Sequence, residues 1–170
     1  MDFTFSKEHE MARKLFADFT ENEVKPLAIE TDETEQFPRE TVTKMQKLGF
    51  LGIPIPKEYG GQGCDPLTYV MCVEELAKAC ATTSVIVSAH TSLCCDPILT
   101  YGTEEQKQKF LKPLASGELL GAFALTEPGA GTDAQALRLK LFSTATSGCS
   151  TAQSASSQTV KRLISISLSP

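Results

Sequence analysis

Acidic residues divide this chain of 170 residues into two unlike parts. All 21 Asp and Glu residues fall within residues 1–133, whereas residues 134–170 have none and contain nine serines. Apolar residues at helical spacing recur through much of the first part. A core therefore has to form within residues 1–133, and we expect residues 134–170 to be a disordered or non-native tail outside it.

Charge and hydropathy exclude several classes of protein. The net charge is −5 and the pI about 5.1, and no cluster of Lys and Arg offers a surface for nucleic acid or anionic lipid. No apolar run approaches the roughly 18 residues of a membrane helix, and residues 1–5 lack the basic and apolar regions of a signal peptide. We expect a cytoplasmic protein without a nucleic-acid or membrane partner.

The cysteines predict reduced thiols in the core. They lie mostly in apolar helical stretches, form no C-x-x-C pair, and are accompanied by only two His, so no metal site is expected. The six are Cys64, Cys72, Cys80, Cys94, Cys95 and Cys149.

Helical patterns account for most of residues 6–117. Ser6 can cap the first helix, with Pro26 inside it or just after it. Its apolar residues recur at three and four positions, which predicts one buried stripe: Met11, Leu15, Phe16 and Phe19.

Four further helices follow ordinary start and stop signals. The second runs from Pro38 to Gly49, and an ordered loop rich in Gly and Pro fills residues 50–63. The remaining helices begin at Asp65-Pro66, at residues 82–84 and at the capping box 103–106, the last ending near residues 116–117. The fourth is apolar nearly all round from Val85 to about Leu93, which is typical of a central helix.

The period changes after Gly121. Residues 122–126 alternate small with large side chains, which predicts a strand, and a glycine-rich turn follows over residues 127–133. A strand that ends in a hydroxyl and a glycine turn can offer a planar cofactor an apolar wall and fixed donors. The alternative is a dinucleotide fingerprint at Gly129-Ala130-Gly131, but helical sequence precedes it and no acidic residue follows Asp133.

The string Gly121-Ala122-Phe123-Ala124-Leu125-Thr126-Glu127-Pro128-Gly129-Ala130-Gly131-Thr132-Asp133 closely resembles the first signature of the acyl-CoA dehydrogenase family. Upstream segments agree in order and spacing, and the resemblance covers residues 1–133. These segments are Leu51-Gly52-Ile53-Pro54, Glu58-Tyr59-Gly60-Gly61, Val73-Glu74-Glu75-Leu76-Ala77 and Tyr101-Gly102-Thr103-Glu104-Glu105-Gln106-Lys107.

The resemblance implies a mainly α fold. It divides the chain into an N-terminal helical domain (1–117), the first strand of a middle β domain (118–133) and a tail unlike the family (134–170). It also implies FAD-dependent α,β-dehydrogenation of a short-chain acyl-CoA, reoxidation by electron-transfer flavoprotein, and a homotetramer.

The resemblance assigns the site residues as well. For FAD they are Phe123, Leu125, Thr126, Gly131 and Thr132. For the acyl-CoA substrate they are Thr132, Ser92, Leu93 and Cys94. His90 is expected to be a satisfied core histidine, and Glu127 to shape the turn.

No catalytic residue is expected in this chain. In that family the catalytic base is a glutamate of the C-terminal domain. Residues 134–170 do not resemble that domain. We therefore expect a truncated and inactive chain. The alternative is a non-catalytic helical fragment that associates with other subunits.

A slip of reading frame near Ala134 accounts for the tail. In the neighbouring frame, the codons for Ser150–Thr159 can spell Leu-Asn-Gly-Ser-Lys-Cys-Phe-Ile-Thr-Asn, which resembles the family's next flavin-contacting strand.

The gene sequence tests this hypothesis directly. We expect its codons after Asp133 to give a family-like reading in the shifted frame. Codons that do not permit that reading would contradict the frame slip.

Overall fold

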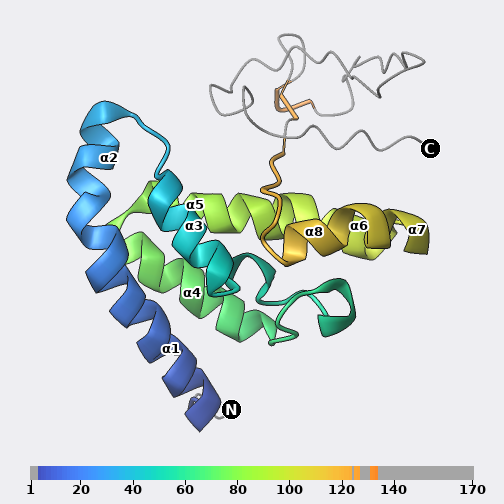
Figure 1. Cartoon of the computed structure of the whole chain (residues 1–170), viewed down its shortest axis with the longest axis horizontal. Helices are drawn as coiled ribbons and strands as arrows, with labels where there is room; N and C mark the ends of the chain where they lie inside the picture. Colours follow the sequence, from blue (N-terminus) through green and yellow to red (C-terminus); the bar gives the residue numbers. More distant parts are fainter. Residues whose placement is uncertain (1–3, 124, 127–130, 134–170) are drawn as a thin grey trace.

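The computed structural model describes residues 4–123, 125–126 and 131–133. These residues form a helical domain with its long helices packed side by side (Figure 1). The predicted tail, the proposed frame slip within it, Cys149 and Glu127 lie outside the described residues. None of the helices in the described ranges is long and apolar enough to cross a membrane.

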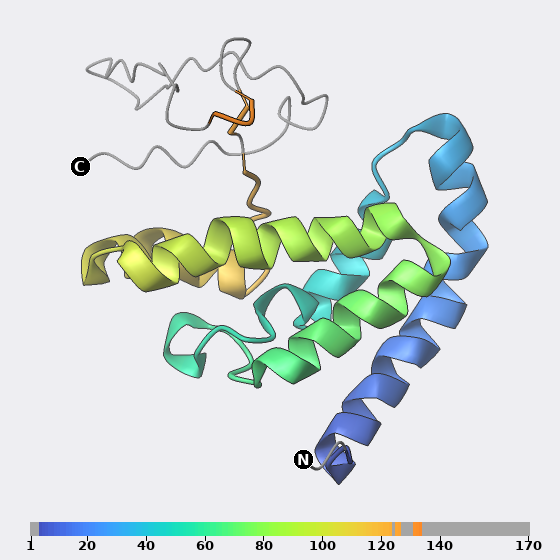
Figure 2. The same cartoon turned by 180° about the vertical axis from the view of Figure 1, so that it is seen from behind.

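The α-helices are connected partly by shorter π and 3-10 turns. In order they are α1 Lys7–Phe19, α2 Ala28–Thr34, α3 Arg39–Lys47, α4 Pro66–Ala79, α5 Ala81–Ser88, α6 Asp96–Tyr101, α7 Glu104–Gln106 and α8 Lys112–Ala115. Helix α1 packs against α4, and α4 packs against α5. From behind, α5 and the segment after it form one long helix across the domain (Figure 2).

The predicted helix starts at Ser6, Asp65 and Thr103 are confirmed by side-chain caps. The start predicted at residues 82–84 is wrong, because these residues lie inside α5, which begins at Ala81. Ser6 accepts the backbone N–H of His9 at 3.2 Å at the start of α1. Thr103 and Gln106 form the predicted capping box of α7. The first helical rod, however, continues past Pro26 to Thr34.

Two irregular turns carry this rod past Pro26. A π turn, Thr20–Val24, is followed by a 3-10 turn, Lys25–Leu27, which contains the proline. Proline lacks an N–H and its ring crowds the carbonyl one turn back, so a regular α ladder cannot pass through it unchanged. The wider and tighter turns absorb this misfit, and helical backbone resumes at Ala28.

The stripe predicted for α1 is wrong in half of its members. Phe16 and Phe19 are buried, but Met11 is 72% exposed and Leu15 is 49% exposed. The spacing pattern treats all four as one face, whereas α1 contacts α4 along a narrower strip that continues to Thr20 and Val24.

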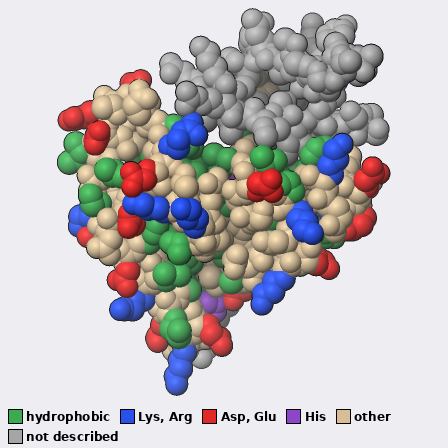
Figure 3. Space-filling model, viewed as in Figure 1, with side chains coloured by type: hydrophobic (Ala, Val, Ile, Leu, Met, Phe, Trp, Pro, Cys, Tyr) green, Lys and Arg blue, Asp and Glu red, His purple; other side chains and the backbone are tan. Residues whose placement is uncertain are grey.

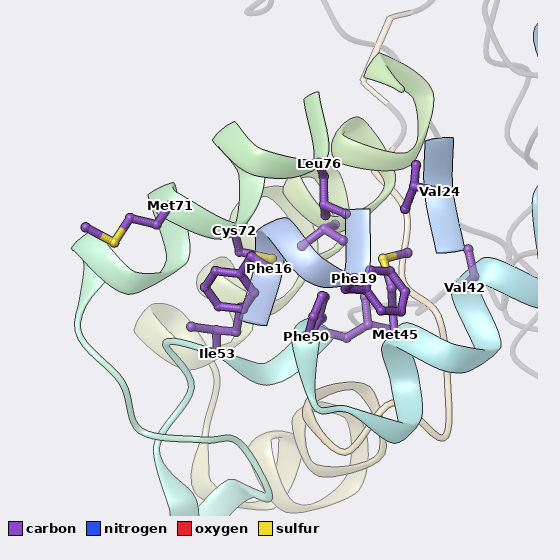
Figure 4. Packing of buried hydrophobic residues seen from close by; sticks show 12 residues of the cluster. Phe16, Phe19, Val24, Val42, Met45, Phe50, Ile53, Met71, Cys72 and Leu76 are labelled. Atoms are coloured by element: carbon purple, nitrogen blue, oxygen red, sulfur yellow. The ribbon is translucent and has the colours of Figure 1, made fainter. Parts of the chain in front are cut away.

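Phe50 stands at the centre of the larger core cluster. Its ring meets Phe16 at 5.1 Å and Phe19 at 4.9 Å between centroids, both edge to face (Figure 4). The buried members of this cluster are Phe16, Phe19, Val24, Val42, Met45, Phe50, Leu51, Ile53, Met71, Cys72, Leu76 and Val87. The cluster thus joins α1, α3, α4 and α5 through the segment that follows α3.

The loop over residues 50–63 is ordered, as predicted, and links two cores. Its Leu51 and Ile53 belong to the larger cluster, while Ile55 and Tyr59 belong to a second one. The second cluster is completed by Cys94, Cys95, Ile98, Leu111, Leu114 and Ala115.

A buried carboxylate ties α1 to α4. Glu75 is nearly buried, and its Oε1 accepts hydrogen bonds from Arg13 Nε and Lys78 Nζ, each at 2.7 Å. Burial opposes ionisation, but the two cations outweigh it and lower the pKa of Glu75. Losing either partner would leave a poorly compensated charge in the α1–α4 contact.

A matched pair of methionines tests this core. We expect Met45→Ala to lower the free energy of unfolding by about 2–5 kcal/mol, because Met45 is fully buried and its removal leaves a cavity. Met11→Ala should cost less than about 0.5 kcal/mol, since its side chain is largely exposed. Urea unfolding of both variants measures the difference. Equal losses would contradict the packing described.

Candidate functional site

No β-strand occurs in the described residues, so the strand predicted over residues 122–126 is not found. Phe123, Leu125 and Thr126 lie in irregular, exposed backbone, with Phe123 49% exposed and Leu125 43% exposed. A strand needs a neighbour to satisfy its backbone, and the described part of this chain supplies only helices. Alternation of side-chain size alone was therefore insufficient to predict a strand.

Three of the predicted substrate residues, Ser92, Leu93 and Cys94, lie on a π turn, Ala89–Cys95, that continues α5, whereas Thr132 lies in an exposed bend further along the chain. Such turns are often found at functional sites. Ser92 and Leu93 are exposed, and the Ser92 hydroxyl donates to the Ser88 carbonyl at 2.7 Å. Cys94 is buried beneath Gly121. Cys94 therefore contacts the chain just before the predicted flavin-binding residues Phe123, Leu125 and Thr126.

The long helix is less central than its composition predicted. Val85 is 60% exposed and Leu93 is 45% exposed in the described structure. The opposite face carries Val87 and His90, which are fully buried. Helix α5 and its continuation thus cover the two core clusters with one face only.

His90 fixes the backbone at Gly121. Its Nδ1 accepts the Gly121 N–H at 2.9 Å, although the two residues are 31 positions apart. Burial lowers the pKa of His90 to about 4, while a hydrogen bond with the backbone of Leu114 acts in the opposite direction. The imidazole is therefore neutral near pH 7, and with Nδ1 as acceptor its proton lies on Nε2.

Cys94 leaves no room for a side chain at position 121. A Cβ on Gly121 would overlap Cys94 Sγ and lie 2.9 Å from Cys94 Cβ and 3.2 Å from Leu114 Cδ2. Burial raises the pKa of the Cys94 thiol, and the backbone of Ala122 offsets this rise only in part. Cys72 and Cys95 are also buried and free, as predicted, but Cys64 is exposed.

The described residues fit one side of a planar, largely apolar group. Phe123 and Leu125 present half-exposed apolar side chains, and Thr126 adds an accessible hydroxyl next to them in the chain. A Cβ on Gly131 would meet no atom within 4 Å, so the backbone there is open to close approach. No group of three or more metal-ligating side chains occurs in the described residues.

The family follows from comparison with known proteins. Residues 6–118 match the family described as "Acyl-CoA dehydrogenase, N-terminal domain". The chain belongs to the acyl-CoA dehydrogenase family. The predicted helical domain of that family is thereby confirmed.

Individual acyl-CoA dehydrogenases agree with this assignment. The short-chain specific acyl-CoA dehydrogenase of Clostridium acetobutylicum is 60% identical over 136 residues, which is 80% of this chain and 36% of that protein. The structure of butyryl-CoA dehydrogenase from Megasphaera elsdenii superposes with a TM-score of 0.77 at 42% identity, covering 82% of this chain and 37% of that one. The chain thus spans little more than a third of these relatives.

A second acyl-CoA dehydrogenase structure was solved in complex with FAD. This enzyme of Bacillus anthracis matches with a TM-score of 0.73 at 41% identity, over 78% of this chain and 23% of that chain.

The sequence suggested the site residues but not what holds them. His90 was expected to be a satisfied core histidine, and its buried hydrogen bonds confirm this. Its partner, the N–H of Gly121, was not predicted. The available signal was the spacing of His90 and Cys94, which places them four positions apart on one helical face.

Two glycines test the packing at position 121. Gly121→Ala should lower the free energy of unfolding by about 1–3 kcal/mol, because the new methyl group overlaps Cys94. Gly131→Ala is the control and should cost less than about 0.5 kcal/mol, since its position is open. Gly121 does not have a positive φ, so the loss of stability in Gly121→Ala would report the side-chain overlap and not backbone strain. Similar losses in a chemical denaturation assay would contradict the close contact.

Proposed function

We propose that residues 4–133 are the part of a cytoplasmic short-chain acyl-CoA dehydrogenase that forms one wall of the site for FAD and acyl-CoA. The observation that carries the proposal is the anchored segment after Gly121, which presents Phe123, Leu125 and Thr126 outward from a rigid helical base. The identity to short-chain and butyryl-CoA enzymes favours a short acyl chain.

Each residue has a distinct part in this proposal. Phe123 and Leu125 supply apolar surface to the flavin, and the Thr126 hydroxyl hydrogen-bonds its polar edge. Gly131 and Thr132 lie where FAD and acyl-CoA approach each other. When bound, FAD accepts the hydride removed from the acyl chain.

Ser92, Leu93 and Cys94 form the proposed approach to the acyl-chain pocket. Their π turn packs beneath the start of the flavin segment through Cys94. Exposed Leu93 offers apolar contact to an acyl chain, whereas the hydroxyl of Ser92 is engaged by its own helix.

The 170-residue chain is proposed to be inactive by itself. Its described residues offer flavin contacts along a single exposed segment, and a flavin held from one side stays largely in water. We propose that the frame slip removes the rest of the site and its catalytic glutamate. Intact relatives would act as homotetramers that pass electrons to electron-transfer flavoprotein.

A chimera tests the function. Residues 1–133 are joined to the remainder of the Clostridium acetobutylicum enzyme at the aligned position. We expect a yellow protein that reduces a dye acceptor with butyryl-CoA, because the chain supplies its half of the site. The 170-residue chain should be colourless and inactive in the same assay. A folded chimera that binds no flavin would contradict the proposal, and a yellow, active 170-residue chain would contradict its inactivity.

The Thr126 hydroxyl is tested within the same chimera. Thr126→Val should weaken FAD binding about three- to tenfold, the worth of one hydrogen bond. Thr100→Val, at an exposed position of α6, is the matched control and should leave flavin affinity unchanged. Equal affinities for the two variants would remove Thr126 from the flavin site.

A further inference from the structure

Two side chains of the π turn contact Gly121, where the chain leaves the helical domain. His90 Nδ1 accepts the Gly121 N–H at 2.9 Å, and Cys94 packs against the same glycine, so that an added Cβ there would lie 2.9 Å from Cys94 Cβ. The two side chains are four positions apart and therefore lie on one face of the helix. Because both contacts come from one helical turn, together they fix the position of the backbone at Gly121.

The position of the anchor in the chain is informative. Gly121 is buried, whereas Ala122, Phe123, Leu125 and Thr126 are exposed. The hydrogen bond from Gly121 to His90 thus lies where the chain passes from the packed domain to its surface. In Figures 1 and 2 the chain leaves the helices beside α5 and α8 at this place.

An apolar residue could fill the volume of His90 but could not accept the Gly121 N–H. A buried amide without an acceptor loses the hydrogen bond that it would make in water, so the segment would move to regain a partner. The other ring nitrogen is also engaged, since Nε2 lies 3.4 Å from Cys95 Sγ. The imidazole is thereby held from both sides and cannot follow a shift of the segment freely.

We propose that His90 is a positioning residue, whose neutral imidazole accepts the Gly121 N–H through Nδ1 and sets where residues 121–126 leave the helical domain. Naming these residues a flavin segment rests on the proposed function. The anchoring itself rests on the hydrogen bonds of His90 alone.

The first test uses NMR spectroscopy on the unmodified 170-residue chain. Nitrogen-15 labelling of the imidazoles gives signals from two histidines, and His9→Asn assigns them by removing one set. We expect His90 to carry its proton on Nε2 at pH 7, with a scalar coupling across the hydrogen bond between Nδ1 and the Gly121 amide nitrogen. A proton on Nδ1, or a Gly121 amide without this coupling, would overturn the proposal.

The second test compares two substitutions of His90. Asparagine can place its Oδ1 near the position of Nδ1 and accept the same N–H, whereas leucine cannot. In His90→Leu we expect amide exchange of Gly121 to accelerate at least tenfold and the backbone order of Leu125 and Thr126 to fall, with Leu76 in the main core unchanged. His90→Asn should recover most of both losses.

Three results would count against this positioning role. The first is unchanged exchange at Gly121 in a folded His90→Leu variant, and the second is unchanged order at Leu125 and Thr126. The third is equal behaviour of the Asn and Leu variants. If His90→Leu fails to fold, the proposal is tested by the scalar coupling between His90 Nδ1 and the Gly121 amide nitrogen in the unmodified chain. None of these readouts needs flavin, so a colourless chimera would refute the proposed function and leave the anchor standing.

Discussion

The contact of Phe50 with Phe16 and Phe19 is the interaction on which the helical domain depends. It joins α1 to the loop that follows α3, and that loop then carries Leu51 and Ile55 into two different cores. Aromatic rings bury a large apolar area with few rotamers, so they set the separation of the elements they join. Everything downstream, including the π turn that carries His90, is packed on this base.

Polar contacts give the base its register. Glu75 with Arg13 and Lys78 fixes α1 along α4, and charges of both signs are spread over the visible surface (Figure 3). Exposed pairs contribute little, but Glu75 is buried and therefore demands its partners. The same logic recurs at Gly121, where a buried N–H demands His90. In both places a polar group inside the domain specifies geometry that apolar packing alone would leave adjustable.

Local signals in the sequence predicted local structure well. The caps at Ser6 and Thr103 were readable because donor and acceptor lie three residues apart. The exposure of Met11 and Leu15 could not be predicted in this way, because it depends on the width of the strip of α1 that α4 covers. Nor could a strand over residues 122–126 be judged without knowing its neighbours. The pairing of His90 with Gly121 spans 31 positions, which no periodicity reveals.

The π turn Ala89–Cys95 has a consequence for how such chains can vary in length. Its wider hydrogen-bonded turn amounts to one extra residue in an otherwise α-helical run. Because the wider turn takes up this extra residue, the helical faces before and after it stay in phase. Loss of one residue between His90 and Cys94 would restore a regular α ladder and leave Cys94 three positions from His90, still on the same face. A single-codon deletion in the π turn can therefore be absorbed, whereas one inside the regular helix α4 would rotate all that follows by about 100°.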